Sequence, residues 1–517
     1  MDDVPTPLRP DGGLRIKSAG RVVAAGARFT FDVEAAAGPA AGAGPLRLSF
    51  PGFRPAGFPE ALPSGGWRLA GCLPEPGFHA LAAEAGGGGR VLAGRDYFVA
   101  RGGGPARPGP GAGDCAEAGY YVFLGCGDYP IITGRETHPL AGWTADRWGE
   151  LVAWMGANGM NRLWVLLNGY TLAYPSKKYP GLRDRNSRNA SEDFLGGLIR
   201  RAHANGVRVH LALTSDGHAR DFSRARPAAV RLDAEGRPDP HFGLALEHPL
   251  TRGYIFDVLD EVLGLYPEAD GVAVHPTESD PERFNPESLA AFREETGRDL
   301  RAEPFAERRA WHNRAFARFM GEIAERCRRH NPAMDVVMLN CPWQDGHAEV
   351  NCELLPAEVR VAVWHYAWED TRPQPWPIYR WVEAFGPGRI IYLPTSQSYL
   401  YPDDPGRVMD RHIGTDRLVS TAAVLGVRNT MYFAGWDILD EEARLCDAML
   451  VQRPTAALAG HPTRSLIPRL YADYFGLREE LMKRRGSVVA GVPDPGIRSS
   501  KTPGSGTPAT KNPAGLG

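Results

Sequence analysis

The chain has 517 residues, which is too long for one ordinary domain and indicates roughly two to four. It contains 59 Lys and Arg against 61 Asp and Glu, and this balance lacks the basic excess of nucleic-acid-binding proteins. Hydrophobic residues make up 43% of the chain, but no run approaches the ~18 apolar residues of a transmembrane helix.

The first residues, MDDVPTPLRPDGG, show no signal-peptide pattern. The seven cysteines form no C-x-x-C pair and no zinc-ligand spacing. We therefore expect a soluble cytoplasmic protein with reduced thiols that binds no metal, cofactor, nucleic acid or membrane. The sequence leaves homo-oligomer formation open.

Residues 1–115 are rich in Gly, Ala and Pro and contain short runs that alternate polar and apolar residues, for example 28–33 and 46–50. Alternation with period two, bounded by Gly and Pro, indicates short half-buried strands. We predict a small β-sandwich over 1–115. Its last stretch, GGGPARPGPGAG at 102–113, has the composition of a linker.

Within residues 116–460, apolar β-prone runs alternate with helical stretches, the pattern of parallel strands joined by crossover helices. Thr144 is the expected N-cap of a helix that ends near Gly159, and another helix is expected over 192–206. The eight expected strands are 120–125, 161–168, 207–214, 271–275, 335–340, 359–364, 389–393 and 427–433.

These units predict a (β/α)8 barrel over 116–460. The alternative, a doubly wound open sheet, usually has a Gly-rich phosphate loop after its first strand, and the turn at 125–128 lacks one. We expect residues 461–485 to form a helical extension. Residues 486–517 are rich in Gly, Pro, Ser and Lys, and this composition predicts a disordered tail.

In (β/α)8 enzymes the active site lies at the C-terminal ends of the strands. Aromatic, amide, imidazole and carboxylate side chains gather after the predicted strands of this chain. Such a mixture suits sugars, because aromatic rings stack on their C–H faces while polar groups bind their hydroxyls. The predicted substrate-binding residues are Asp128, Asn168, Tyr170, Asp216, His275, Asn340, Trp343, His365, Tyr366, Trp368, Tyr399, Trp436 and Asp437.

Glu278 follows the fourth predicted strand, where partial desolvation would raise the pKa of a carboxylic acid and suit it to protonate a leaving oxygen. The alternative is an exposed loop residue that caps the helix near Asn285. Glycoside hydrolysis needs a second carboxylate, ~5–5.5 Å away for retention or ~6.5–9.5 Å for inversion. Glu369 and Asp370 are the best-placed partners, ahead of three others: Asp216, Glu247 and Asp437.

The seventh strand continues as PTSQSY, which disfavours a nucleophile from that strand. His210 alternates with apolar residues and is predicted to line the core. A metal site built from several histidines is conceivable but has no ligand-spaced pair, and no G-x-S-x-G elbow supports serine catalysis. The histidines considered for that metal site are His218, His241, His248 and His275.

The segment YYVFLGCGDYPIITGRETHPLAGWTADRWGELVAWMGANGMNRLWVLLN resembles the first barrel units of α-glucuronidases and related β-hexosaminidase-like glycosidases. That family has a β-rich domain before its barrel, and in α-glucuronidases the fourth strand ends in a Ser-Glu element whose glutamate is the general acid. Thr277-Glu278 is similar to this element. The chain departs from β-hexosaminidases, which have Asp where Thr277 stands, and the later carboxylate positions of the family have no matching context.

Together these features predict a glycoside hydrolase that acts on an oligosaccharide or glycoside, with Glu278 as the general acid and Glu369 or Asp370 as the base or stabiliser. Two alternatives remain open at this stage. One is a non-catalytic carbohydrate-binding barrel that keeps the aromatic rim. The other is a metal-dependent hydrolase or isomerase on the same fold.

Overall fold

The protein is described from a computed structural model. Its described residues are 14–18, 22–35, 46–50, 52–74, 77–87, 90–101, 117–124, 139–240, 242–276, 282–340, 352–366, 376–395, 422 and 425–433. The predicted linker, helical extension and C-terminal tail lie outside these ranges, so those domain boundaries stay predictions.

The N-terminal part contains two β-sheets. The first has the order β1-β3-β7-β5, with β6 also paired to β7, and the second has the order β2-β9-β8-β4. The strands of the first sheet are Leu14–Ser18 (β1), Arg28–Ala35 (β3), Arg54–Pro55 (β5), Glu60–Ala61 (β6) and Trp67–Cys72 (β7). Those of the second are Val22–Ala24 (β2), Leu46–Ser49 (β4), Gly77–Gly87 (β8) and Arg90–Arg101 (β9).

One apolar cluster contains side chains from both of these sheets. Phe31 and Val33 of β3 are buried together with Leu81 of β8 and Phe98 of β9. The rings of Phe31 and Phe98 lie 5.6 Å apart between centroids, and Phe29 lies 5.0 Å from Phe98. The short alternating runs therefore supply a shared core, as the period-two pattern predicts.

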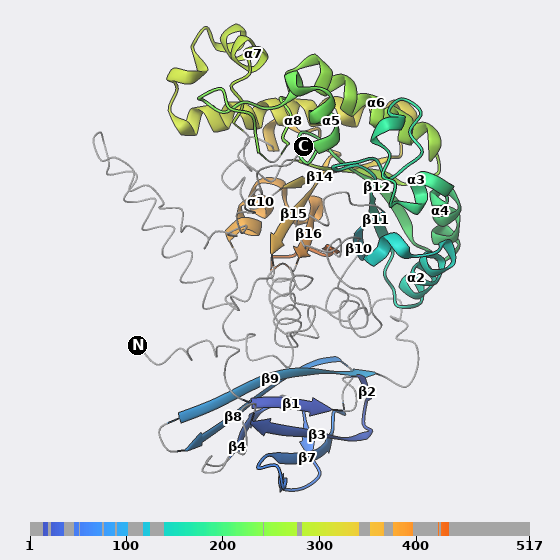
Figure 1. The fold of residues 1–517 in the computed structure, drawn as a ribbon, viewed down its shortest axis with the longest axis vertical. Helices are drawn as coiled ribbons and strands as arrows, with labels where there is room; N and C mark the ends of the chain where they lie inside the picture. The colour runs from blue at the N-terminus through green and yellow to red at the C-terminus, as the bar shows by residue number, and fades with distance from the viewer. Residues whose placement is uncertain are drawn as a thin grey trace, which may run out of the picture. The chain divides into compact units, whose positions relative to one another are not determined.

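The central architecture is a closed barrel of eight parallel strands, which confirms the predicted fold class (Figure 1). The barrel closes because β10 pairs in parallel with both β11 and β17. All eight expected strands are present. They are β10 (Glu117–Phe123), β11 (Arg162–Leu166), β12 (Arg208–Thr214), β13 (Gly271–His275), β14 (Asp335–Asn340), β15 (Arg360–Tyr366), β16 (Ile390–Thr395) and β17 (Asn429–Phe433).

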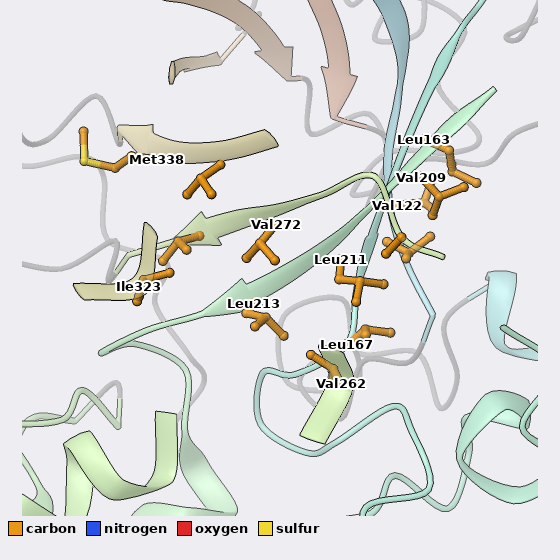
Figure 2. Close-up of a cluster of buried hydrophobic side chains, with 14 of the residues drawn as sticks. Val122, Leu163, Leu167, Val209, Leu211, Leu213, Val262, Val272, Ile323 and Met338 are labelled. Carbon is orange, nitrogen blue, oxygen red and sulfur yellow. The ribbon is translucent and has the colours of Figure 1, made fainter. Parts of the chain in front are cut away.

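Side chains alternate between the two faces of each barrel strand. Outward-facing Val209, Leu211 and Val272 belong to one buried apolar cluster that also contains Val262 and Ile323 from surrounding helices (Figure 2). Inward-facing side chains form a second buried cluster inside the barrel, made of Tyr121, Phe123, Trp164, Leu166, Ala212, Ala273, Val337, Leu339, Ala362, Trp364, Ile391, Leu393 and Met431. The barrel interior is therefore a packed core.

The first crossover helices follow the sequence signals closely. Helix α2 (Ala145–Ala157) begins after Thr144, whose hydroxyl accepts the Arg147 N–H, and Gly159 ends the turn with a φ of 75°. The helix expected over 192–206 instead begins later, as α4 (Leu195–Ala204). It is separated from the short α3 (Arg188–Glu192) because Asp193 adopts a left-handed φ of 52°.

Helices α7, η4 and α8 lie between β13 and β14. A small separate core in this region contains Phe284, Phe292, Leu300 and Trp311, whereas Ile323, further along α8, belongs to the barrel cluster. No helix in the described ranges is long and apolar enough to cross a membrane. The elements are α5 (Arg220–Ala225), α6 (Pro249–Leu265), α7 (Pro286–Thr296), α8 (Phe305–His330), α10 (Trp376–Phe385), η1 (Pro139–Gly142), η2 (Pro180–Leu182), η3 (Pro227–Ala229), η4 (Leu300–Ala302) and η6 (Pro387–Arg389).

A charged network closes the N-terminal end of the barrel. Arg360 donates to Asp335 and to Glu117, Arg162 also pairs with Glu117, and His210 Nε2 lies 2.8 Å from Asp335. Burial alone would raise the pKa of Asp335, but His210 and Arg360 outweigh it and hold that pKa below its ordinary value. His210 is 1% exposed, which confirms its predicted place in the core.

Candidate active site

Seven predicted substrate-binding residues lie in the described part of the chain, and five of these are at or just beyond the C-terminal ends of β11 to β14. These five are Asn168, Tyr170, Asp216, His275 and Asn340. His365 and Tyr366 lie in β15, where their backbones pair with residues of β16. The other predicted site residues lie outside the described ranges: Asp128, Glu278, Trp343, Trp368, Glu369, Asp370, Tyr399, Trp436 and Asp437.

His275, the last residue of β13, occupies the centre of a group of rings inside the C-terminal end of the barrel. Its Nδ1 shares a hydrogen bond of 3.0 Å with the hydroxyl of Tyr121, on β10. The ring of Trp364, on β15, stands at 86° to the imidazole with 4.8 Å between centroids. The imidazole therefore links three strands, two of which are not its neighbours in the sheet.

The group continues toward β11 and β12 through His218 and Tyr170. The His218 ring lies 6.0 Å from His275, and the Tyr170 ring lies 6.1 Å from His218. The guanidinium of Arg220 lies over the Tyr170 ring, with its Cζ 4.9 Å from the ring centroid. We name Tyr121, Tyr170, His218, His275 and Trp364 the rim cluster.

The segment that presents His218 has an unusual backbone. His218 has a φ of 54° and Phe242 a φ of 60°, and the Ala219 N–H donates to the Phe242 carbonyl at 3.3 Å. A left-handed conformation costs a non-glycine residue ~1–3 kcal/mol, and such strained residues recur at functional sites. This backbone aims the His218 ring at the rim cluster.

Asp216, just after β12, belongs to a buried chain of three charges. The Ser215 hydroxyl donates to its Oδ1 at 2.9 Å, and the Arg283 Nη1 lies 3.9 Å from its Oδ2. Arg283 in turn donates two hydrogen bonds, of 3.0 and 2.8 Å, to the carboxylate of Glu247. Burial would raise the pKa of Glu247, but the Arg283 charge and the Ser288 hydroxyl keep it below its ordinary value.

The Asn168 side chain, just after β11, is hydrogen-bonded to the backbone of Thr214, the last residue of β12. Its side-chain oxygen accepts the Thr214 N–H at 2.7 Å, and its amide nitrogen donates to the Thr214 carbonyl at 3.2 Å. These two bonds extend the pairing of β11 and β12 beyond their last ladder residues. The geometry assigns the Asn168 amide a role in holding the ends of these strands together.

Three residues of the site were not predicted from the sequence, namely Tyr121, Trp364 and Arg283. The alternation within the strands could have indicated the first two, because Tyr121 shares a face with Phe123, and Trp364 shares one with Ala362. For Arg283 there was no signal, since its partner Glu247 is 36 residues away. Within the described residues, no group of three or more His, Cys, Asp or Glu is arranged to hold a metal ion.

Comparison with known proteins finds no matching protein-family profile and no matching curated protein sequence. Solved structures with a similar chain path include a β-N-acetylhexosaminidase from Bacteroides fragilis, at 11% identity and a TM-score of 0.44, covering 76% of this chain and 74% of that one. A family 20 exo-β-N-acetylglucosaminidase from Vibrio harveyi matches at 10% identity and a TM-score of 0.42, covering 88% and 98%.

A β-galactosidase from the haloarchaeon Halorubrum lacusprofundi matches at 15% identity and a TM-score of 0.44, covering 66% of this chain and 57% of that one. None of these three structures is named as an α-glucuronidase. At such identities and TM-scores the likenesses carry no information on the activity of this chain.

Proposed function

We propose that this protein is a glycoside hydrolase that cleaves an O-glycosidic bond at the C-terminal end of its barrel, with Glu278 as the general acid. The contact between His275 and Trp364 carries this proposal. It joins a side chain of β13 to one of β15 inside the barrel, and these strands lead to Glu278 and to the Glu369-Asp370 pair.

Chain connectivity limits how far these carboxylates can lie from the contact. Glu278 follows His275 by three residues, so its Cα lies within ~11 Å of the His275 Cα. Glu369 follows Trp364 by five residues. Two carboxylates that follow strands whose inward-facing rings are in contact can reach the ~5–10 Å separation that glycoside hydrolysis requires.

The rim cluster supplies surroundings suited to a sugar. The aromatic rings of Tyr170 and Trp364 and the polar side chains of Asp216 and His275 are gathered, buried, at the same end of the barrel.

The test compares wild type with Glu278→Gln on a panel of aryl and natural glycosides that includes uronides and hexosaminides. We expect wild-type turnover and a loss of ~10²-fold or more in the variant, smallest for substrates whose leaving group needs no proton. Glu294→Gln, a matched change on the exposed face of α7, should keep full activity. Unchanged turnover in folded Glu278→Gln would refute Glu278 as the acid.

A non-catalytic carbohydrate-binding barrel is the second candidate. It is favoured by PTSQSY, which follows the start of β16 and carries no carboxylate. In that case wild type binds a member of the panel without cleaving any, and Glu278→Gln binds it equally well.

A further inference from the structure

Arg283 is the most deeply buried arginine of the described residues, with a side chain that is 0% exposed. An ionised guanidinium at such a depth must be compensated by charge and by hydrogen bonds, because its desolvation costs several kcal/mol. Glu247 provides that compensation through two hydrogen bonds. Glu247 is therefore the main charge partner of Arg283, and Asp216 is a more distant one.

Its backbone is fixed as firmly as its side chain. The Arg283 N–H donates to Nε2 of His312, on α8, at 3.0 Å. The next residue, Phe284, donates its N–H to the Leu232 carbonyl, and Asn285 donates its amide to the Val230 carbonyl. Arg283 thus occupies a fixed point between α8 and the segment that precedes α6.

From this fixed point the third nitrogen of the guanidinium faces Asp216. Nη1 lies 3.9 Å from Oδ2, while Ser215 donates to Oδ1 on the other side of the same carboxylate. The carboxylate is 2% exposed, so the protein groups packed around it set its orientation. Each of its oxygens has a different neighbour, which restricts its rotation.

We propose that Arg283 is a positioning residue that holds the Asp216 carboxylate in place as the acceptor of a hydrogen bond from a sugar hydroxyl. This inference rests on the proposed function, in which Asp216 binds substrate. Arg283 itself does not touch the sugar. Lysine cannot replace it, because one ammonium group cannot donate two bonds to Glu247 and face Asp216 at the same time.

The experiment is a double-mutant cycle of Arg283→Lys and Asp216→Asn, with KM and kcat measured on the best substrate of the panel and Kd measured by calorimetry. We expect Arg283→Lys to raise KM and Kd about tenfold, with a smaller change in kcat. In the Asp216→Asn background it should have no further effect, because its target carboxylate is gone. Arg360→Lys breaks a comparable buried ion pair at the opposite end of the barrel and should leave KM unchanged.

Three results would overturn the inference. If the Arg283→Lys variant has a lower thermal stability but unchanged KM and Kd, Arg283 has a structural role alone. Equal KM increases in both backgrounds show that Arg283 does not act through Asp216. Wild type that neither cleaves nor binds any sugar refutes the proposed function and this inference together, whereas the first two results, with active wild type, refute only the inference.

Discussion

The Tyr121 hydroxyl lies 3.0 Å from His275 Nδ1, so the first and fourth strands of the barrel are joined across its interior. These strands are not neighbours in the sheet. The bond fixes the imidazole that precedes Glu278 by three residues, and it ties the geometry of the rim to the packing of the barrel core.

Tyr121→Phe tests this link, because it removes the hydroxyl and keeps the ring. We expect the free energy of unfolding to fall by about 1 kcal/mol, the usual worth of one buried hydrogen bond, and kcat/KM to fall with it. Urea unfolding and steady-state kinetics measure the two effects. A variant with wild-type values of both would show that His275 is held by its other contacts.

Asp335→Asn tests the network at the N-terminal end of the barrel. Asparagine leaves Arg360 and His210 without their shared carboxylate, so we expect a loss of about 3 kcal/mol in urea unfolding. KM should not change, since Asp335 lies at the end of the strands opposite to the rim. Asp146→Asn, at an exposed pair with Arg201, is the control and should cost well under ~1 kcal/mol.

The same variant should also change the response to acid. The pKa of Asp335 is depressed in the folded state, so its contribution is complete above its unfolded pKa of ~3.9 and is lost as the pH falls below that value. Stability of Asp335→Asn should therefore fall less steeply than that of wild type between about pH 4 and pH 2. Parallel curves for the two proteins would contradict the assignment.

The sequence predicted the barrel well because its signals are local. Each strand is a short apolar run, and Gly159 and Gly206 mark helix ends by adopting positive φ. The site could be predicted only in part, because its decisive contacts join distant residues. His312 meets Arg283 across 29 positions and Tyr121 meets His275 across 154, and neither pairing leaves a trace in composition or period.

His312 gives a further prediction on pH. It is fully buried on α8, and burial, followed by the charges of Arg283, Arg231 and Arg308, holds its pKa well below the ordinary value. The unfolded chain takes up a proton at this residue below about pH 6.5 and the folded protein does not. The free energy of unfolding therefore decreases as the pH falls below this value, by up to ~1.4 kcal/mol for each pH unit.

His312→Gln should flatten this part of the stability curve between about pH 6.5 and pH 5, because glutamine does not titrate and can still accept the Arg283 N–H. The measurement is urea unfolding at half-unit intervals of pH. His330→Gln, on the exposed end of the same helix, should follow wild type. A slope equal to that of wild type in His312→Gln would show that other groups cause the acid sensitivity.

Glu261 on α6 anchors the loop that follows β11 and contains Tyr170. Its carboxylate accepts hydrogen bonds from the Tyr174 and Ser176 hydroxyls and from the backbone N–H groups of Lys177 and Lys178. Glu261→Ala removes all four acceptor contacts at once. The loop should then open locally without global unfolding, because local stability depends on such contacts.

Trypsin provides a direct measure of this opening, since Lys177 and Lys178 are exposed but their backbones are held. We expect cleavage at these lysines to become about tenfold faster or more in Glu261→Ala, with little change in the unfolding midpoint. Glu268→Ala removes only a 3.4 Å contact to Arg200 and should be cleaved as slowly as wild type. Equal cleavage rates in all three proteins would mean that the loop is held by its apolar contacts, with Glu261 contributing little to the position of Tyr170.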